Sequence, residues 1–398
     1  MYTQSNPMSR LLATFLFASA IVMAQPVTVP LILEGNAPIV ELEFPSASGI
    51  RKARFVVDTG GGAFILGSKL MADIGAKATG PASKDEPGVV PLEPVAVRLG
   101  GMALDLTGVQ TIGLLGQRGP ISRNDAEGLV PGRLLRNYEV VFDYPARRFT
   151  LAKPGAIGPR GVKVKTPISS SSGFPRIELQ IGGVLNGFLL DTGASFTMIS
   201  RAALDGWAKT EAAWPAATGA VGFANMFGGK MESEALMLRI AEIDIGTISL
   251  KNVAAVSRPE GTFEKYMSSM MTAPIIGALG GNVLRDFRVE IDYKNGFTYL
   301  ERTASTEDAD LLSVGLVLQA GTDGNPLVSG ISSAAAADVK AQVQISDKLL
   351  AVDGAPLQGM SLAAVAAALQ GTTGARKQLS LERDGKALTV SVTIKKLL

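Results

Sequence analysis

Two short acidic motifs contain the side chains of this sequence best suited to chemistry. Asp58-Thr59-Gly60 follows the apolar run 55–57, and Asp191-Thr192-Gly193 follows the apolar run 188–190. Each motif sets an aspartate at the end of an apolar strand, and its glycine permits a tight turn that a second turn can approach closely. Two carboxyl groups held close together share one proton, because both cannot be ionised. The ionised group can take a proton from water while the protonated group donates a hydrogen bond to a carbonyl oxygen.

The composition removes most other catalytic chemistries. The 398 residues include no His and no Cys. Without His, Ser-His and Cys-His catalysis and most transition-metal sites are excluded, and without Cys there are no disulfides, thiolate nucleophiles or iron–sulfur clusters. The chain has 38 Lys and Arg against 36 Asp and Glu, a net charge of +2, which argues against a nucleic-acid partner. Aspartates and glutamates remain, and we expect no metal or cofactor.

The two motifs belong to two copies of a longer pattern. Downstream of them, Phe64 and Ser68 match Phe196 and Ser200 at one constant spacing. Further segments match at a longer constant spacing: 128–130, 135–138 and 143–144 in the first copy, and 277–279, 284–287 and 292–293 in the second. Most segments alternate polar and apolar residues between Gly-rich turns, which is typical of strands. We therefore expect two homologous, mostly β lobes at 25–160 and 161–302, with short helices at 68–74, 200–207 and 133–137.

The doubled Asp-Thr-Gly motif, with a Leu-Arg-x-Phe/Tyr and Asp-Tyr segment after each copy, resembles the aspartic proteases. It is most similar to the bacterial retropepsin-like branch, with both lobes in one chain, over roughly residues 30–302. The resemblance implies two β-barrel lobes and an endopeptidase whose catalytic pair is Asp58 and Asp191. It also implies that Thr59 and Thr192 tie the two turns together, and that Gly60 and Gly193 supply backbone contacts to the carboxylates.

The first turn departs from the family pattern. It continues as Gly61-Gly62-Ala63, one residue longer than the second turn before the matching Phe. Extra glycine is expected to loosen the turn. Neither Gly61 nor Ala194 offers the hydroxyl found after the glycine in pepsin-like members. Losing a hydrogen bond to the ionised form raises the pKa of a carboxyl group, so we expect a pH optimum less acidic than that of pepsin. The altered turn also leaves an alternative, a catalytically impaired protease-fold protein that binds peptides.

A Gly-rich, aromatic stretch in the second copy is a candidate for a hairpin flap over the substrate cleft. It runs from Gly219 through Phe223 to Gly229, and its counterpart in the first copy lies near 80–94. An ordinary mobile loop is the alternative for this stretch.

The sequence after a polar, acidic linker at 303–311 resembles a bacterial PDZ domain. Residues 312–398 show strands at 315–318 and 326–328, an Ala-rich helical run at 332–341, a second helix at 361–369 and a final hairpin that turns at 384–385. The segment Gly315-Leu316-Val317-Leu318 matches the loop and strand that bind peptide ends in that family. Such a domain adds an extended peptide to a sheet edge, so we expect a protein or peptide partner here. Val317 and Ser346 depart from the family pattern, which leaves an intramolecular role, such as covering the cleft, as the alternative.

The N-terminus has the pattern of an export signal. Arg10 precedes an uncharged apolar run at 11–24, which ends in small residues suited to a signal peptidase and is too short for a comfortable membrane span. We expect a mature chain from Gln25, exported to the periplasm or secreted. Because no Cys follows the cleavage site, we expect no lipid anchor. A buried N-terminal helix is the alternative.

Overall fold

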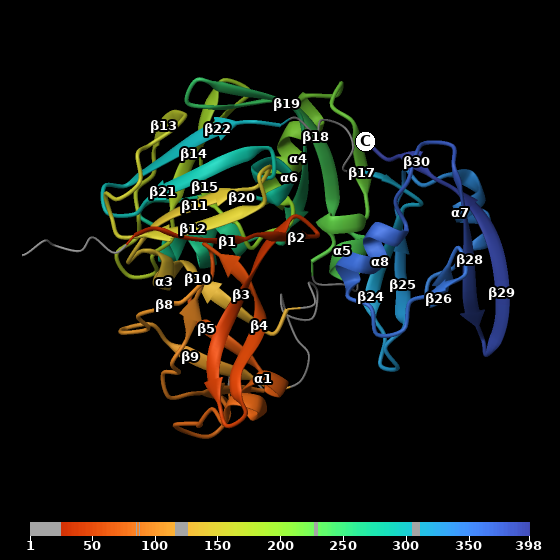
Figure 1. The fold of residues 1–398 in the computed structure, drawn as a ribbon. Coiled ribbons are helices and arrows are strands. Elements are labelled where there is room, and N and C mark those ends of the chain that lie inside the picture. The colour runs from red at the N-terminus through yellow and green to blue at the C-terminus, as the bar shows by residue number, and fades with distance from the viewer. Residues whose placement is uncertain (1–24, 85, 87, 116–125, 227–229, 305–310) are drawn as a thin grey trace, which may run out of the picture.

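The computed structural model describes residues 25–84, 86, 88–115, 126–226, 230–304 and 311–398. The predicted export signal at 1–24 and most of the predicted linker lie outside the described residues. The protein is mostly β and consists of two lobes, a sheet shared between them, and a C-terminal domain (Figure 1). This confirms the fold class expected from the sequence. In the part of the chain that the structure describes, no helix has the length and apolar character needed to cross a membrane.

The first lobe is one twisted sheet in the order β6-β9-β5-β10-β4-β3-β7-β8, with β2 on β3. The long hairpin β3–β4 forms because its residues alternate between core and surface, so that Leu42, Phe44 and Phe55 enter the core. The strands are β2 (Ile32–Glu34), β3 (Ala37–Ser46), β4 (Gly49–Asp58), β5 (Phe64–Gly67), β6 (Val89–Pro91), β7 (Arg98–Leu99), β8 (Met102–Ala103), β9 (Thr111–Leu114) and β10 (Gly128–Pro131). The helices are α1 (Ser68–Ile74), which has the predicted bounds and ends at left-handed Gly75, and α3 (Gly132–Leu135).

The second lobe repeats this arrangement and closes it into a barrel. Its order is β14-β15-β20-β16-β19-β18-β17, and β14 also pairs with β18. The strands are β14 (Arg176–Ile181), β15 (Val184–Leu190), β16 (Thr197–Ser200), β17 (Ala216–Thr218), β18 (Leu236–Ile245), β19 (Ile248–Arg258) and β20 (Gly277–Leu279). The helical segments are α4 (Arg201–Thr210), η1 (Gly222–Ala224), α5 (Lys230–Ser233), η2 (Thr262–Met267), η3 (Ser268–Met270) and α6 (Gly281–Leu284). In both lobes, matching strands pair with the same polarity, as a repeat requires: β10 with β4, and β20 with β15, are parallel.

A sheet built from both copies joins the two lobes. Its order is β1-β12-β11-β21-β22-β13, and the antiparallel pair β11–β21 lies at its centre. The strands are β1 (Val27–Pro30), β11 (Glu139–Asp143), β12 (Arg148–Ala152), β13 (Val162–Lys165), β21 (Phe287–Asp292) and β22 (Phe297–Arg302). Each copy contributes three strands in the same relation, so the sheet has an approximate two-fold axis between Val141 and its partner Glu290.

The C-terminal domain is a curved sheet in the order β24-β25-β26-β28-β29, with β27 on β26. The strands are β23 (Leu312–Ser313), β24 (Leu316–Ala320), β25 (Pro326–Ile331), β26 (Lys348–Val352), β27 (Ala355–Pro356), β28 (Arg376–Arg383), β29 (Lys386–Thr393) and β30 (Lys395–Lys396). The helices are α7 (Ala337–Gln342) and α8 (Leu362–Ala368).

One predicted helix boundary in this domain is wrong. The helical run expected from residue 332 starts only at Ala337, because Ser332 and Ser333 make backbone hydrogen bonds to other segments. The Ser332 N–H donates to the Gly315 carbonyl at 2.8 Å, and the Ser333 N–H donates to the Thr218 carbonyl of the second lobe at 3.0 Å. A tertiary contact therefore overrides the helix preference of the alanines.

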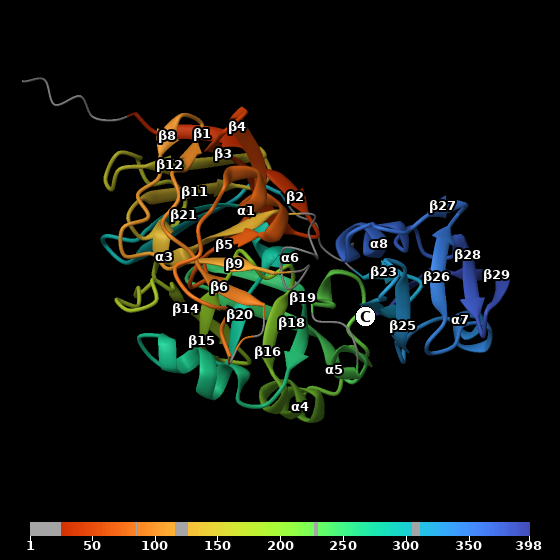
Figure 2. The same ribbon diagram turned by 90° about the horizontal axis from the view of Figure 1, so that it is seen from below.

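The C-terminal domain packs against the second lobe. Figure 1 places β24, β25 and α8 beside β17 and α5 of that lobe, and Figure 2 shows β25 near α5 when the molecule is seen from below. One apolar cluster continues across the contact and includes Val221 and Met237 from the lobe with Val317, Leu397 and Leu398 from the C-terminal domain. Leu397 and Leu398 are thus buried in the contact, where their apolar side chains stabilise it.

Candidate active site

Each Asp-Thr-Gly turn begins where a central strand leaves its parallel neighbour. Asp58 is the last residue of β4 and pairs with Pro131 of β10. Asp191 follows β15, whose Leu190 pairs with Leu279 of β20, and its N–H donates to the Leu279 carbonyl at 3.1 Å. The segment Ile275–Gly277 leads into β20 and so lies beside β15, the strand that carries the second turn. The repeat thereby brings two equivalent turns to the junction of the lobes.

Reciprocal hydrogen bonds between two buried threonines lock the turns together. The Thr59 hydroxyl donates to the Leu190 carbonyl at 2.5 Å and accepts the Thr192 N–H at 3.0 Å. The Thr192 hydroxyl donates to the Val57 carbonyl at 2.7 Å and accepts the Thr59 N–H at 3.1 Å. Both threonines are fully buried. The hydroxyls therefore satisfy backbone groups of the opposite lobe that no water reaches.

Each carboxyl group lies over the glycine of the other turn. A Cβ added at Gly193 would lie 2.2 Å from Cγ of Asp58, and one added at Gly60 would lie 3.1 Å from Cγ of Asp191. Real Cβ atoms do not approach as closely as the first distance, so the second turn requires glycine at this position. Each carboxyl group is thus held at the lobe junction against the turn that carries the other carboxyl group.

The carboxylates are oriented by backbone N–H groups of their own turns. Asp58 Oδ1 accepts the Gly60 N–H at 2.8 Å, and Asp191 Oδ1 accepts the N–H groups of Gly193 at 3.0 Å and Ala194 at 3.1 Å. In the longer first turn, the Gly61 N–H instead donates to the Asp58 carbonyl at 3.1 Å. The two turns therefore differ in how their second N–H group is used, and this difference traces to the inserted glycine.

The two glycines that follow Gly60, Gly61 and Gly62, have different surroundings. A Cβ at Gly61 would lie 2.7 Å from Cδ2 of Leu129, so this residue is packed and bonded. A Cβ at Gly62 would meet nothing within 4 Å. A side chain at Gly62 would thus meet open space, while Gly61, which lies nearest Asp58, is held in place.

Two tyrosines lie near the carboxyl groups. They occupy equivalent positions in the sequence repeat, which indicates no role for them. Tyr144 and Tyr293 are buried, and their hydroxyls have no hydrogen-bond partner among the described residues. Burial raises the pKa of both phenols, and the negative charges of Asp191 on Tyr144 and of Asp58 on Tyr293 raise it further. Both phenols therefore stay neutral and form a low-polarity surrounding for the carboxyl pair.

Asn36 also contacts the second turn, and no motif in the sequence points to this contact. Its Nδ2 donates to the Ser195 carbonyl at 3.1 Å, and its Oδ1 accepts from Nη1 of Arg285 at 3.2 Å. Asn36 is buried and adopts a left-handed conformation with φ of 65°. The adjacent Gly35-Asn36 pair is a hairpin-turn signal, which could have located the turn but not its contact with the opposite lobe.

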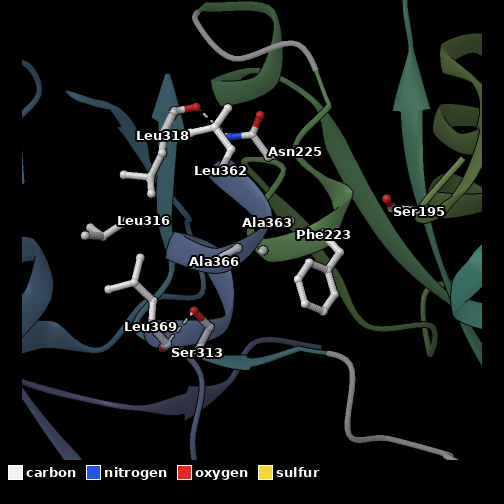
Figure 3. Close-up of a pocket in the computed structure, with 11 residues that line it drawn as sticks. Ser195, Phe223, Asn225, Ser313, Leu316, Leu318, Leu362, Ala363, Ala366 and Leu369 are labelled. Carbon is white, nitrogen blue, oxygen red and sulfur yellow. Dashed lines mark hydrogen bonds between the residues drawn. The ribbon is translucent and has the colours of Figure 1, made fainter. Parts of the chain in front are cut away.

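The predicted peptide-binding residues of the C-terminal domain lie beside an apolar pocket. Leu316 and Leu318 of β24 line it together with residues of α8, whereas Val317 points to the opposite side and packs in the cluster shared with the second lobe. Gly315 precedes the strand with φ of 85°, and a Cβ there would lie 2.8 Å from that of Ala335. Figure 3 shows Leu316, Leu318 and Leu369 on one side of this pocket and Phe223 of the second lobe on the other.

The predicted flap of the second lobe is the connection between β17 and β18, which pair as a hairpin. Its described part, 219–226, contains η1, while residues 227–229 of the predicted flap lie outside the described residues. In the first lobe the predicted counterpart contains an isolated bridge between Ala78 and Leu92. The hairpin topology is thus present in both lobes.

Two family models match the chain. Residues 177–283 match the aspartyl protease model, and residues 307–382 match the PDZ domain model. The first match runs from β14 to α6, so it includes the second Asp-Thr-Gly turn and the barrel around it. No curated protein matches the sequence.

Solved structures resemble separate parts of the chain. An aspartic proteinase from Irpex lacteus is 15% identical with a TM-score of 0.41, over 72% of this chain and 99% of that one. The PDZ domain of a carboxy-terminal protease from Vibrio cholerae, solved with a peptide, is 22% identical with a TM-score of 0.20, over 21% of this chain and 94% of that one. A photosystem II D1 C-terminal processing protease is 27% identical with a TM-score of 0.21, over 22% of this chain and only 24% of that one. From the two family models, the chain contains an aspartyl protease domain followed by a PDZ domain.

Proposed function

We propose that the protein is an exported aspartic endopeptidase that hydrolyses peptide bonds with a water activated between Asp58 and Asp191. The observation that carries the proposal is the pair of Asp-Thr-Gly turns from two lobes, linked by reciprocal Thr59 and Thr192 hydrogen bonds. Such a linkage holds two carboxyl groups in a fixed mutual position, which a shared-proton mechanism needs. The aspartyl protease match over the second turn supports it.

The proposed reaction needs only the two carboxyl groups and water. The ionised carboxylate takes a proton from the water, whose oxygen attacks the peptide carbonyl carbon. The protonated carboxyl group donates a hydrogen bond to the carbonyl oxygen and stabilises the negative charge that develops there. Collapse of the tetrahedral intermediate breaks the C–N bond, and the leaving nitrogen receives a proton from the pair. No bond forms between enzyme and substrate.

The proposed substrates are proteins outside the cytoplasm, in the periplasm or the secreted medium. The apolar run at 11–24 and its small-residue end support export. The PDZ match supports binding of an extended peptide, which would capture or position a protein substrate.

The test is cleavage of unfolded casein by purified residues 25–398 at pH 3 to 7. The matched variants are Asp58→Asn and Asp191→Asn, which keep the side-chain size, and Asp384→Asn in the exposed β28–β29 turn as the control. We expect wild type and the control to cleave casein and both active-site variants to lose at least a hundredfold in rate. Cleavage that survives either active-site substitution would overturn the proposal.

The alternative is a protease-fold protein that binds peptides without cleaving them, favoured by the longer first turn. Absence of cleavage by correctly folded wild type at every pH, combined with binding of labelled casein peptides, would support this second function.

A further inference from the structure

The peptide groove of the PDZ domain faces the protease lobe instead of solvent. The groove lies between β24 and α8, and η1 of the second lobe lies against α8 on its open side (Figure 3). Phe223 and Asn225 from the β17–β18 connection line the same pocket as Leu316, Leu318 and Leu369 of the PDZ domain. One wall of the groove therefore belongs to the protease.

A carbonyl group on the outer edge of β24 already accepts a hydrogen bond from the second lobe. On one side β24 pairs with β25, and it is the end strand of its sheet. On the other side, Nδ2 of the buried Asn225 donates to the Leu318 carbonyl at 2.7 Å. An extended peptide added to this edge would need the same carbonyl for its own N–H group, so it competes with Asn225.

The space left in the groove is too small for a peptide side chain. The cavity between the two domains measures about 20 Å³. That volume accepts about one water molecule. The PDZ side of the cavity is mostly apolar, with Ser313 as the polar residue in its lining, and the half-buried Phe223 of the second lobe lines the opposite side.

The covering turn is firmly attached on its protease side. The Arg258 guanidinium, which is buried, bonds both carboxylate oxygens of Glu232 at 3.0 and 3.1 Å and donates to the Ala224 carbonyl at 2.8 Å. The close approach of this turn to the PDZ domain also depends on Gly219, where φ is 96° and an added Cβ would lie 3.1 Å from Val317. The turn is therefore built to sit between the two domains.

We propose that residues 219–226 close the PDZ groove, and that an extended peptide with an apolar end must displace this turn to bind. The same cavity is lined by Ser195, four residues after Asp191, so the turn connects the PDZ groove with the loop that carries the second carboxyl group. Peptide capture by the PDZ domain thus releases residues 219–226 from the groove. Closure of the groove is independent of catalysis, and only its effect on cleavage rests on the proposed function.

The test uses the absence of Cys from the chain to place a single thiol in the groove. Ala366, on α8, is buried and lines the cavity, so Ala366→Cys reports groove opening through its rate of reaction with N-ethylmaleimide. We expect the rate to rise about tenfold or more when Asn225→Asp, which cannot donate to Leu318, is combined with Phe223→Ala. Asn186→Asp is the matched control, because Asn186 Nδ2 makes a similar bond to the Val184 carbonyl at the exposed start of β15. Equal rates in the double variant and the control would overturn the proposal.

A second measurement uses peptides and does not depend on activity. The probe is a pool of fluorescein-labelled ten-residue peptides that end in Val, Leu or Ile with a free carboxylate, and full-length protein carries Asp58→Asn so that the probe is not cleaved. We expect the variant with the opened groove to bind the pool at least tenfold more tightly than the parent, with unchanged thermal unfolding as the check on folding. Equal affinity of both proteins would overturn the proposal, whether or not the chain is a protease.

Discussion

Replacing Thr192 by Val tests the linkage that places the two carboxyl groups. Valine has nearly the shape of threonine, so the packing changes little while the hydroxyl is lost. In the fully buried junction, the change leaves the Val57 carbonyl and the Thr59 N–H without the partners that now lie at 2.7 and 3.1 Å. The variant therefore measures what the cross-lobe hydrogen bonds contribute.

The expected loss follows from two orphaned backbone groups. Each buried group left unsatisfied costs about 1–3 kcal/mol, so with two such groups we expect the free energy of unfolding to fall by roughly 2–6 kcal/mol. Thr192→Ser keeps both hydrogen bonds and removes one methyl group, which costs about 1 kcal/mol. The two variants should therefore be separated by at least ~1 kcal/mol.

Urea unfolding followed by tryptophan fluorescence gives the required measurement. The two tryptophans, Trp207 and Trp214, both belong to the second lobe and contact each other at 6.4 Å between ring centroids. Their signal therefore reports the lobe that carries Thr192. A Val variant as stable as the Ser variant would refute the reasoning, because losing the hydroxyl would then cost no more than losing the methyl group.

Two further predictions concern the active-site glycine and the PDZ domain. Gly193→Ala puts a Cβ 2.2 Å from Cγ of Asp58, so the rate of casein cleavage should fall at least about a hundredfold. Gly62→Ala adds a Cβ with nothing within 4 Å, so its cleavage rate should stay within about twofold of wild type. Similar losses of rate in the two variants would contradict the geometry. Burial works against the charge of Asp347, yet two 2.7 Å bonds from Arg383 hold the pKa of its carboxyl below the ordinary 3.8. Because the folded-state pKa is lowered, this stabilisation is present above pH 3.8 and is lost as the pH falls through the folded value. Asp347→Asn should thus cost roughly 2–4 kcal/mol at pH 7 and progressively less as the pH is lowered below 3.8 in thermal unfolding, and a pH-independent difference would contradict the assignment.

Local patterns in the sequence predicted local structure well. Helix α1 has the predicted bounds because Ser68 follows a strand and Gly75 ends the helix in a left-handed conformation, both short-range effects. The predicted helix from 332 was wrong because Ser333 bonds to Thr218, a residue more than a hundred positions away. Asn36 was missed for the same reason, since its partner Ser195 lies in the other lobe.

The sequence by itself determined which groups can carry the chemistry. The lack of His and Cys leaves carboxylates, and the repeat shows that Asp58 and Asp191 occupy equivalent turns. The tertiary structure decided that these turns meet through their threonines, and that the turn around Asn225 closes the PDZ groove. Residue types and turns follow from neighbours along the chain, whereas these contacts depend on how segments far apart pack, which no local pattern encodes.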